Sequence, residues 1–155
     1  MKFPEFAGKL TGRSGPYTIG YFVARDEKSP YTIPLEEGTV TRRSGKSTVN
    51  VVRGSRSFGQ SSNLGFMLTD RRFDGGGYGT IMSVDGRLRL SQNYSAVGQY
   101  IMSYTGEPDD SLKTVGLENY MFDHDKYTAA LDGEEYSGNA FIAQLRRRGR
   151  RLNMS

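Results

Sequence analysis

The sequence predicts an all-β protein, an antiparallel meander of about six to eight long strands that forms an open or closed β-barrel. Two neighbouring runs, over residues 78–91 and 94–105, alternate between apolar and polar or small side chains. Such alternation indicates strands, because successive side chains of a strand point to opposite faces. Glycine makes up 20 of the 155 residues, well above its usual share of about 7%. We expect a single domain over residues 1–155.

The hairpin formed by these two runs is the strongest signal. Its runs reach about twelve residues, whereas strands of globular proteins usually stop at about five or six. A tilted strand that crosses a bilayer takes roughly nine to eleven residues. Tyrosines near both ends of the apolar face, such as Tyr78, Tyr94 and Tyr104, are typical of membrane interfaces. A long soluble hairpin produces the same alternation, so both interpretations stay open at this point.

Composition excludes several classes of protein. Hydrophobic residues make up 35% of the chain and the mean hydropathy is −0.60. No stretch approaches the roughly 18 apolar residues of a membrane-spanning helix. A transmembrane barrel stays compatible, because its strands are half polar and its glycines serve curvature and close packing. The absence of cysteine excludes disulfides, thiol catalysis and zinc–thiolate sites.

Turn chemistry divides the first half of the chain into strands. A Gly-Pro turn at residues 15–16 separates the first two, because glycine supplies a positive φ and proline fixes the next φ. A long polar connection with two prolines follows over residues 26–46, and we interpret it as a loop. The strands expected in this half cover residues 6–13, 17–24, 48–56 and 63–70.

The second half is organised around the long hairpin. A connection over residues 71–77 precedes the hairpin, and residues 91–93 turn its two strands. Residues 107–135 are acidic and loop-like, with a short strand around residues 117–122. The last strand covers residues 136–147. Short connections thus alternate with long ones, as turns and loops do at the two rims of an outer-membrane barrel.

Five segments resemble a known family when they are taken together. They are AGKLTGRSGPYTIG at residues 7–20, VNVVR at 49–53, QSSNLG at 60–65, YGTIMSVDG at 78–86 and the stretch 132–153. In this order they resemble the uncharacterised β-barrel domain that follows a family 9 carbohydrate-binding-like module in many Gram-negative outer-membrane proteins. The resemblance covers nearly the whole chain. It implies a barrel in the outer membrane, associated with polysaccharide binding or uptake, and it transfers no catalytic residues.

The sequence also departs from this family. The signal peptide and the upstream module of such proteins are absent from it, as are the strands expected after Asn153. We therefore expect an excerpt of the early and middle barrel, or a reduced relative of it.

The polar face of the strands carries the candidate lumen or binding residues. They are Asn50, Asp85, Arg87, Arg89 and Gln99. If the apolar face meets lipid, these side chains point inward, where opposite charges pair and fill a narrow barrel. A path for a substrate is the alternative. If the chain is soluble, the faces invert and the apolar side becomes a core around an apolar ligand.

The net charge of +4 is concentrated near the end of the chain. The candidate basic contact consists of Arg146, Arg147, Arg148, Arg150 and Arg151. Such a cluster could bind nucleic acid, anionic lipid headgroups or a protein partner, or it could be a solvated strand end. Among these, we do not expect nucleic acid, because no aromatic residue for base stacking follows Phe141.

Residues that could support catalysis or metal binding are few. Neighbouring positions of an extended segment point to opposite faces, so the Asp-His-Asp cluster at residues 123–125 needs a turn to converge on one metal ion. Glu107 with residues 109–110, or residues 134–135, could hold calcium weakly, but the spacing of a calcium loop is absent. No nucleophile elbow occurs in the sequence. The sequence therefore predicts no enzyme activity, no cofactor and no metal site.

These observations favour a structural segment of an outer-membrane β-barrel in a Gram-negative cell-envelope protein associated with polysaccharide binding or uptake. Its expected partners are membrane lipid, further barrel strands or an envelope protein, and a glycan. One alternative is a soluble β-barrel module that binds a small apolar or glycan ligand. Another is a basic subunit that binds a partner through its arginine-rich end.

Overall fold

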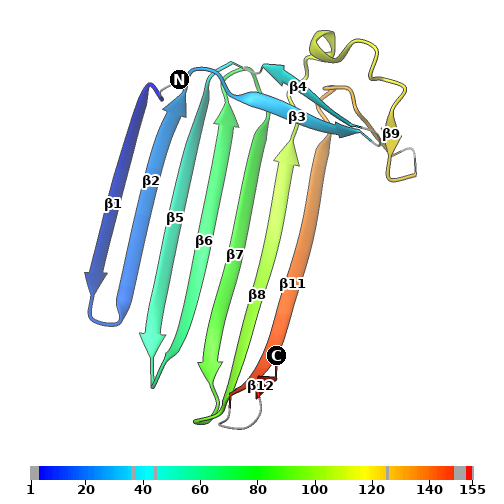
Figure 1. Ribbon diagram of the computed structural model, residues 1–155. Helices are drawn as coiled ribbons and strands as arrows, with labels where there is room; N and C mark the ends of the chain where they lie inside the picture. The colour runs from blue at the N-terminus through cyan, green and yellow to red at the C-terminus, as the bar shows by residue number, and fades with distance from the viewer. Residues whose placement is uncertain (1–3, 36–37, 44, 125, 149–152, 155) are drawn as a thin grey trace.

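Seven long strands form one antiparallel sheet in the computed structural model, which describes residues 4–35, 38–43, 45–124, 126–148 and 153–154 (Figure 1). The long strands are β1 (Phe6–Ser14), β2 (Tyr17–Asp26), β5 (Ser47–Phe58), β6 (Ser62–Phe73), β7 (Tyr78–Arg89), β8 (Tyr94–Gly106) and β11 (Glu135–Arg148). They lie in this order across the sheet, and the short strand β12 (Asn153–Met154) pairs with the end of β11. The predicted all-β antiparallel meander is confirmed.

The connections at one end of the sheet contain short elements. The hairpin of β3 (Pro30–Leu35) and β4 (Gly38–Arg43) crosses this end (Figure 1). The interpretation of residues 26–46 as a loop is therefore wrong. The two prolines of this segment argued against a strand. Among the described strands β3 pairs with β4 alone, however, and an edge strand tolerates the missing N–H groups.

The segment between β8 and β11 is mostly irregular, as predicted. It contains η1 (Ser111–Thr114), β9 (Met121–Phe122) and β10 (Tyr127–Thr128). The strand expected around residues 117–122 is reduced to its last two residues. The N–H group of Leu117 donates to the carbonyl of Thr114 at 2.9 Å, and that of Tyr120 donates to the carbonyl of Leu117 at 3.1 Å. These local bonds turn the chain before β9 begins.

The pairing register fixes which side chains share a face of the sheet. The ladders run without interruption, so Val84 lies opposite Tyr100, and the next residue, Asp85, lies opposite Gln99. We call the face of Val84 the apolar face and the face of Asp85 the polar face. The predicted division of the long hairpin is confirmed: the apolar face holds Val84, Leu88, Tyr100 and Met102, and the polar face holds Asp85, Arg87 and Gln99.

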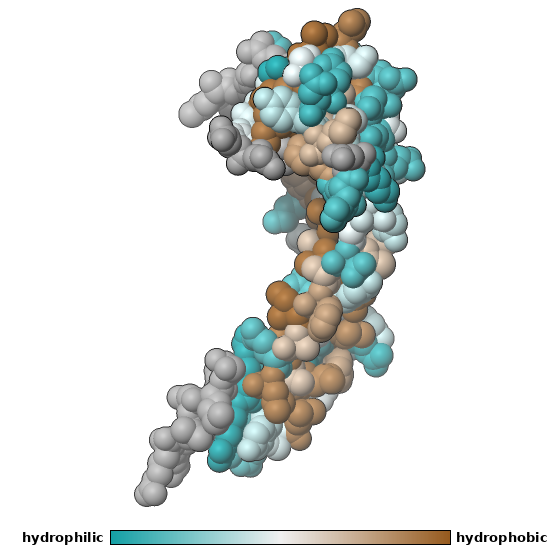
Figure 2. All heavy atoms as spheres, turned by 90° about the vertical axis from the view of Figure 1, so that its right-hand side faces the viewer, coloured by the Kyte–Doolittle hydropathy of each residue, from teal (hydrophilic) through white to brown (hydrophobic). Residues whose placement is uncertain are grey.

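The described residues cover little of the apolar face. Figure 2, in which the β11 side faces the viewer, shows a thin curved sheet with the added elements gathered at one end. The exposed large apolar side chains of the long strands lie on the apolar face, with the exceptions Phe22, Ile81 and Ile142. Val84 is 49% exposed and Phe66 is 50% exposed. Among the described residues, Ala24 is the one buried apolar side chain of these strands.

The two ends of the sheet differ in their connections. At the end that we call the turn rim, short turns join β1 to β2, β5 to β6 and β7 to β8 (Figure 1). Gly15 takes a φ of 55° in the first of these turns, as predicted. The opposite end, which we call the loop rim, carries the β3–β4 hairpin and a longer segment. This longer segment, residues 107–134, is named the cap. The cap has a small interior in which the Leu131 N–H group donates to the buried Thr114 hydroxyl at 2.9 Å.

Charged side chains link the first strands at the loop rim. Arg25 donates to Glu5 at 3.1 Å and to Asp74 at 2.5 Å. Lys46 donates to Glu5 as well, and this hydrogen bond holds the pKa of Glu5 below its ordinary value. Because these groups are exposed, each pair is expected to contribute little to stability.

Within the described ranges, no helix is long and apolar enough to cross a membrane.

Candidate functional site

The apolar face forms a continuous band across the long strands. One row of paired residues near its middle consists of Ile19, Gly54, Phe66, Val84, Tyr100 and Phe141. Tyrosines lie near both ends of the band, with Tyr17 and Tyr94 toward the turn rim and Tyr78 and Tyr104 toward the loop rim. The part of the chain that the structure describes places no second layer over this band.

A polar row borders the band on its loop-rim side. Asn50 lies opposite Asp70, which in turn lies opposite Thr80. The Thr80 hydroxyl donates to Asp70 at 2.6 Å, and the Tyr21 hydroxyl donates to Asn50 Oδ1 at 2.8 Å. The prediction that Asn50 shares the polar face with Asp85 is therefore wrong. Alternation fixes the face of Asn50 only within its own strand, whereas its relation to β7 depends on the registers of β5 with β6 and of β6 with β7.

The polar face carries an ion pair that crosses a strand. Arg53 on β5 extends over β6 and donates two hydrogen bonds to Asp85 on β7, one of them from Nη2 to Oδ2 at 2.8 Å. Gly65 lies between them on β6, and a Cβ at this position would lie 2.7 Å from Arg53 Nη2. The missing side chain of Gly65 therefore makes room for the pair.

Arg53 was not among the residues predicted for this face. The sequence signal for Arg53 lay in the alternation of its strand, which places Arg53 on the face opposite to that of Asn50. The pairing of opposite charges that we predicted for the polar face does occur, with Arg53 as the partner of Asp85.

The remaining predicted residues lie on the polar face. Gln99 on β8 lies opposite Asp85 on β7, and Arg87 and Arg89 follow Asp85 along β7 toward the turn rim. Arg89 donates to the carbonyl of Ser91 at 3.3 Å. Neither arginine has an acidic partner among the residues that the structure describes. Their role as a lumen or binding face stays a prediction.

The arginines predicted as a basic contact divide between the two faces. Arg146 lies on the polar face and donates to Gln144 Oε1 at 2.7 Å. Arg147 lies on the apolar face, with its guanidinium carbon 5.7 Å from the centre of the Tyr94 ring. These two neighbours therefore do not form one patch. The side chain of Arg148 and the whole of Arg150 and Arg151 lie outside the described residues.

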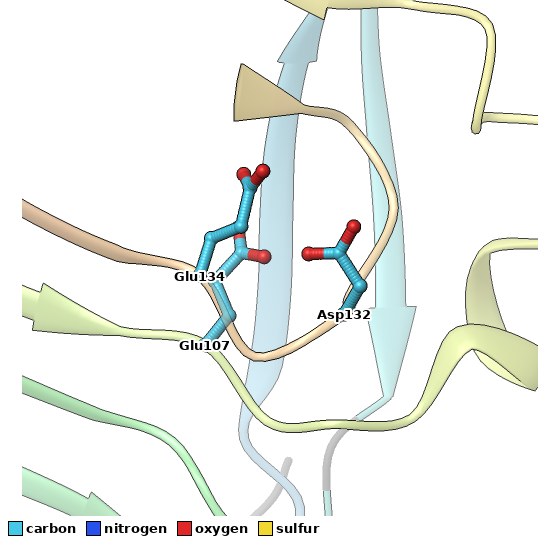
Figure 3. A group of neighbouring side chains, drawn as sticks. All are labelled: Glu107, Asp132 and Glu134. Carbon is cyan, nitrogen blue, oxygen red and sulfur yellow. The ribbon is translucent and has the colours of Figure 1, made fainter. Parts of the chain in front are cut away.

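Three carboxyl groups meet at the loop rim (Figure 3). Glu107 directly follows β8, and Asp132 and Glu134 precede β11, so the pairing of these two strands brings them together. One carboxylate oxygen from each residue lies within 4.8 Å of those from the other two. Thr128 donates to Asp132 and to Glu134 at 3.0 Å each. In contrast, Glu107 has one buried carboxyl oxygen without a hydrogen-bond partner.

Glu107 is the member of this acidic cluster whose pKa is shifted from its ordinary value. Burial raises its pKa, and the nearby charges of Glu134 and Asp132 raise it further. Such an arrangement favours binding a proton, and three carboxylates are also the type of ligand that calcium uses. In the sequence, Glu107 and Glu134 belong to two separate acidic groups, and Asp132 was not predicted in either. That the chain has no metal site stays a prediction.

The Asp-His-Asp cluster gives no converging set of ligands among its described members. The His124 side chain is fully exposed, and its Nδ1 lies 3.8 Å from Asp123 Oδ1. Asp125 lies outside the described residues.

Comparisons of the chain with protein-family models, with curated proteins and with solved structures find no match. The resemblance to an outer-membrane barrel domain therefore stays a prediction.

The room that Gly65 leaves for the ion pair can be tested directly. Gly65→Ala should lower the free energy of unfolding by about 0.5–1 kcal/mol, because the new methyl group displaces the flexible end of Arg53 and breaks its partly exposed ion pair with Asp85. Gly79→Ala is the matched control, since Gly79 lies on the same face and a Cβ added to it would meet no heavy atom within 4 Å. Urea titration measures the free energy of unfolding of each variant. Equal stability of the two variants would contradict this role of Gly65.

The raised pKa of Glu107 gives a pH-dependent prediction. When folding raises the pKa of a carboxyl group, the protein's free energy of unfolding falls as pH rises through that pKa. Glu107→Gln should therefore stabilise the protein at pH 7, and the gain should vanish below about pH 4, under the ordinary glutamate pKa. Exposed Glu27→Gln is the control and should be neutral at both pH values. A pH-independent effect of Glu107→Gln would contradict the prediction.

Proposed function

We propose that the chain forms part of the wall of a transmembrane β-barrel whose apolar face meets lipid. The observation that carries the proposal is the band of exposed apolar side chains on one face of seven long strands. An uncovered apolar patch larger than a few hundred Å² usually marks an interface with protein or membrane. The band extends across the whole sheet, which is more than a single binding patch requires.

The length of the strands supports a membrane-spanning role. The five strands β5, β6, β7, β8 and β11 have 12 to 14 residues each. Twelve residues extend about 40 Å at about 3.3 Å each, so a tilt of about 45° gives a height of about 28 Å. The hydrocarbon core of a bilayer is about 30 Å thick.

The side chains at the ends of the band support the same role. Arginine and tyrosine lie together on the apolar face at both rims, as Arg56 with Tyr17 and as Arg72 with Tyr78. Amphipathic rings and long cationic side chains are the groups that favour the interface between headgroups and acyl chains. The polar face would then point inward, where Arg53 and Asp85 neutralise each other.

Further barrel strands are the proposed protein partners. The outer edge of β1 and most of the outer edge of β11 carry no strand among the described residues. A barrel satisfies such edges by closing the sheet. Placement in the outer membrane of a Gram-negative cell, and an association with polysaccharide, rest on the sequence resemblance alone.

Arginine substitutions at different depths test the proposal. Val84→Arg, in the middle of the band, should lower the free energy of folding into zwitterionic vesicles by roughly 2–4 kcal/mol, because a charge is placed in the hydrocarbon. The same change at Tyr94 or Tyr104, near the rims, should cost about 0–1 kcal/mol. Denaturant titration of the vesicle-inserted chain measures all three.

Gln99→Arg is the control at the depth of Val84. Gln99 lies on the polar face, beside the Asp85 that pairs with Arg53, so a charge there should be tolerated. Equal costs at Val84, Tyr94 and Tyr104 would contradict a lipid-facing surface and would favour a soluble protein whose apolar face is a core.

A further inference from the structure

The two rims of the sheet differ in charge. Every acidic side chain that the structure describes lies toward the loop rim, except Asp85, which is bound to Arg53. The turn-rim halves of the strands carry Arg13, Arg56, Arg87, Arg89, Arg146 and Arg147. A membrane that met this sheet would therefore be in contact with a cationic belt at one interface alone.

Arg56 is one of two cations of this belt on the apolar face, the other being Arg147 beside Tyr94. Arg56 is opposite Tyr17, and its guanidinium carbon lies 5.4 Å from the centre of the Tyr17 ring. No acidic side chain within the described ranges pairs with it. Arg72 at the loop rim has the same contact with a tyrosine, 4.7 Å from Tyr78, but Asp70 neutralises it at 3.0 Å. The positive charge of Arg56 is thus available to a ligand.

An apolar groove adjoins Arg56. It has a volume of about 470 Å³ and is lined by Ile19, Gly54, Leu64, Phe66 and Val84, among others. The Phe66 ring packs against Gly54, where a Cβ would collide with it. This volume is within the range of about 300–1,000 Å³ that ligand sites have. The lining belongs to the middle of the band, so the groove runs from the apolar band to the cationic belt.

We propose that this groove and Arg56 bind one phospholipid with an anionic headgroup. The headgroup phosphate accepts hydrogen bonds from the Arg56 guanidinium, and an acyl chain lies in the groove between Ile19 and Phe66. Charge complementarity selects an anionic headgroup, because the phosphate of a zwitterionic lipid is accompanied by its own cation, whereas an anionic lipid offers a net negative charge to the unneutralised arginine. The inference rests on the proposed function, and it names the lipid class and the rim at which it binds.

Tryptophan fluorescence tests the inference, because the chain has no tryptophan of its own. A single tryptophan is introduced as Phe66→Trp, or as Leu64→Trp should the first variant not fold. The full chain is inserted into phosphatidylcholine vesicles that contain a minor fraction of either brominated phosphatidylglycerol or brominated phosphatidylcholine. The anionic lipid should quench this tryptophan at an effective affinity about fivefold or more above that of the zwitterionic lipid, the factor expected for one arginine at a membrane surface.

Two arginine variants and one reporter position complete the experiment. Arg56→Gln should abolish the preference for the anionic lipid, whereas Arg72→Gln should leave it unchanged because Arg72 is already neutralised. A tryptophan at the loop rim, Tyr104→Trp, should show no preference. Equal quenching by the two lipids, or a preference that survives Arg56→Gln, would overturn the lipid site and leave the proposed function intact. Absence of quenching by both lipids would contradict the lipid-facing surface itself.

Discussion

Removal of the apolar face from water is the requirement on which the rest of this fold depends. The long strands expose apolar side chains such as Phe66, Val84 and Phe141 over one face, and no layer of described protein packs on them. A soluble protein gains most of its stability by burying such a face. In this sheet the burial has to come from something other than the described residues, whether lipid, a protein partner or closure of the sheet on itself. The backbone hydrogen bonds of the meander hold the strands together in each case.

The polar face is consistent with the same requirement. Small side chains and glycines occupy much of it, and its charges are arranged so that Arg53 and Asp85 neutralise each other across Gly65. A narrow interior tolerates charges of both signs only when they pair. On the long strands, the arginines with described side chains that lack an acidic partner lie instead toward the turn rim. The asymmetry between the rims thus follows from where charge can be neutralised.

The sequence predicts the long strands well and the relations between them less well. Alternation of β7 and β8 identifies their faces, because a period of two is unambiguous over twelve residues. Asn50 was assigned to the wrong face, because its position relative to β7 depends on two registers that no local pattern fixes. The β3–β4 hairpin was missed because Pro30 and Pro34 argue against strands in general, whereas an isolated edge tolerates them.

The acidic cluster shows a different limit of prediction from the sequence. Glu107 and Asp132 lie near the two ends of the cap and meet because β8 pairs with β11 from Gly106 and Glu135 onward. Composition identified the segment as acidic, but no spacing rule connects its two ends. Sites that depend on closure of a long loop therefore require coordinates, whereas sites within one hairpin can be predicted from the sequence.

The most direct test of the central claim is whether the chain folds without a lipid-like phase. Far-UV circular dichroism and size-exclusion chromatography should be recorded in detergent-free buffer and in micelles of a neutral detergent. A lipid-facing sheet predicts a cooperatively unfolding β-sheet spectrum and a single species in micelles, with aggregation or loss of that spectrum in buffer. A folded monomer in buffer, with the same spectrum and a cooperative transition, would contradict the claim.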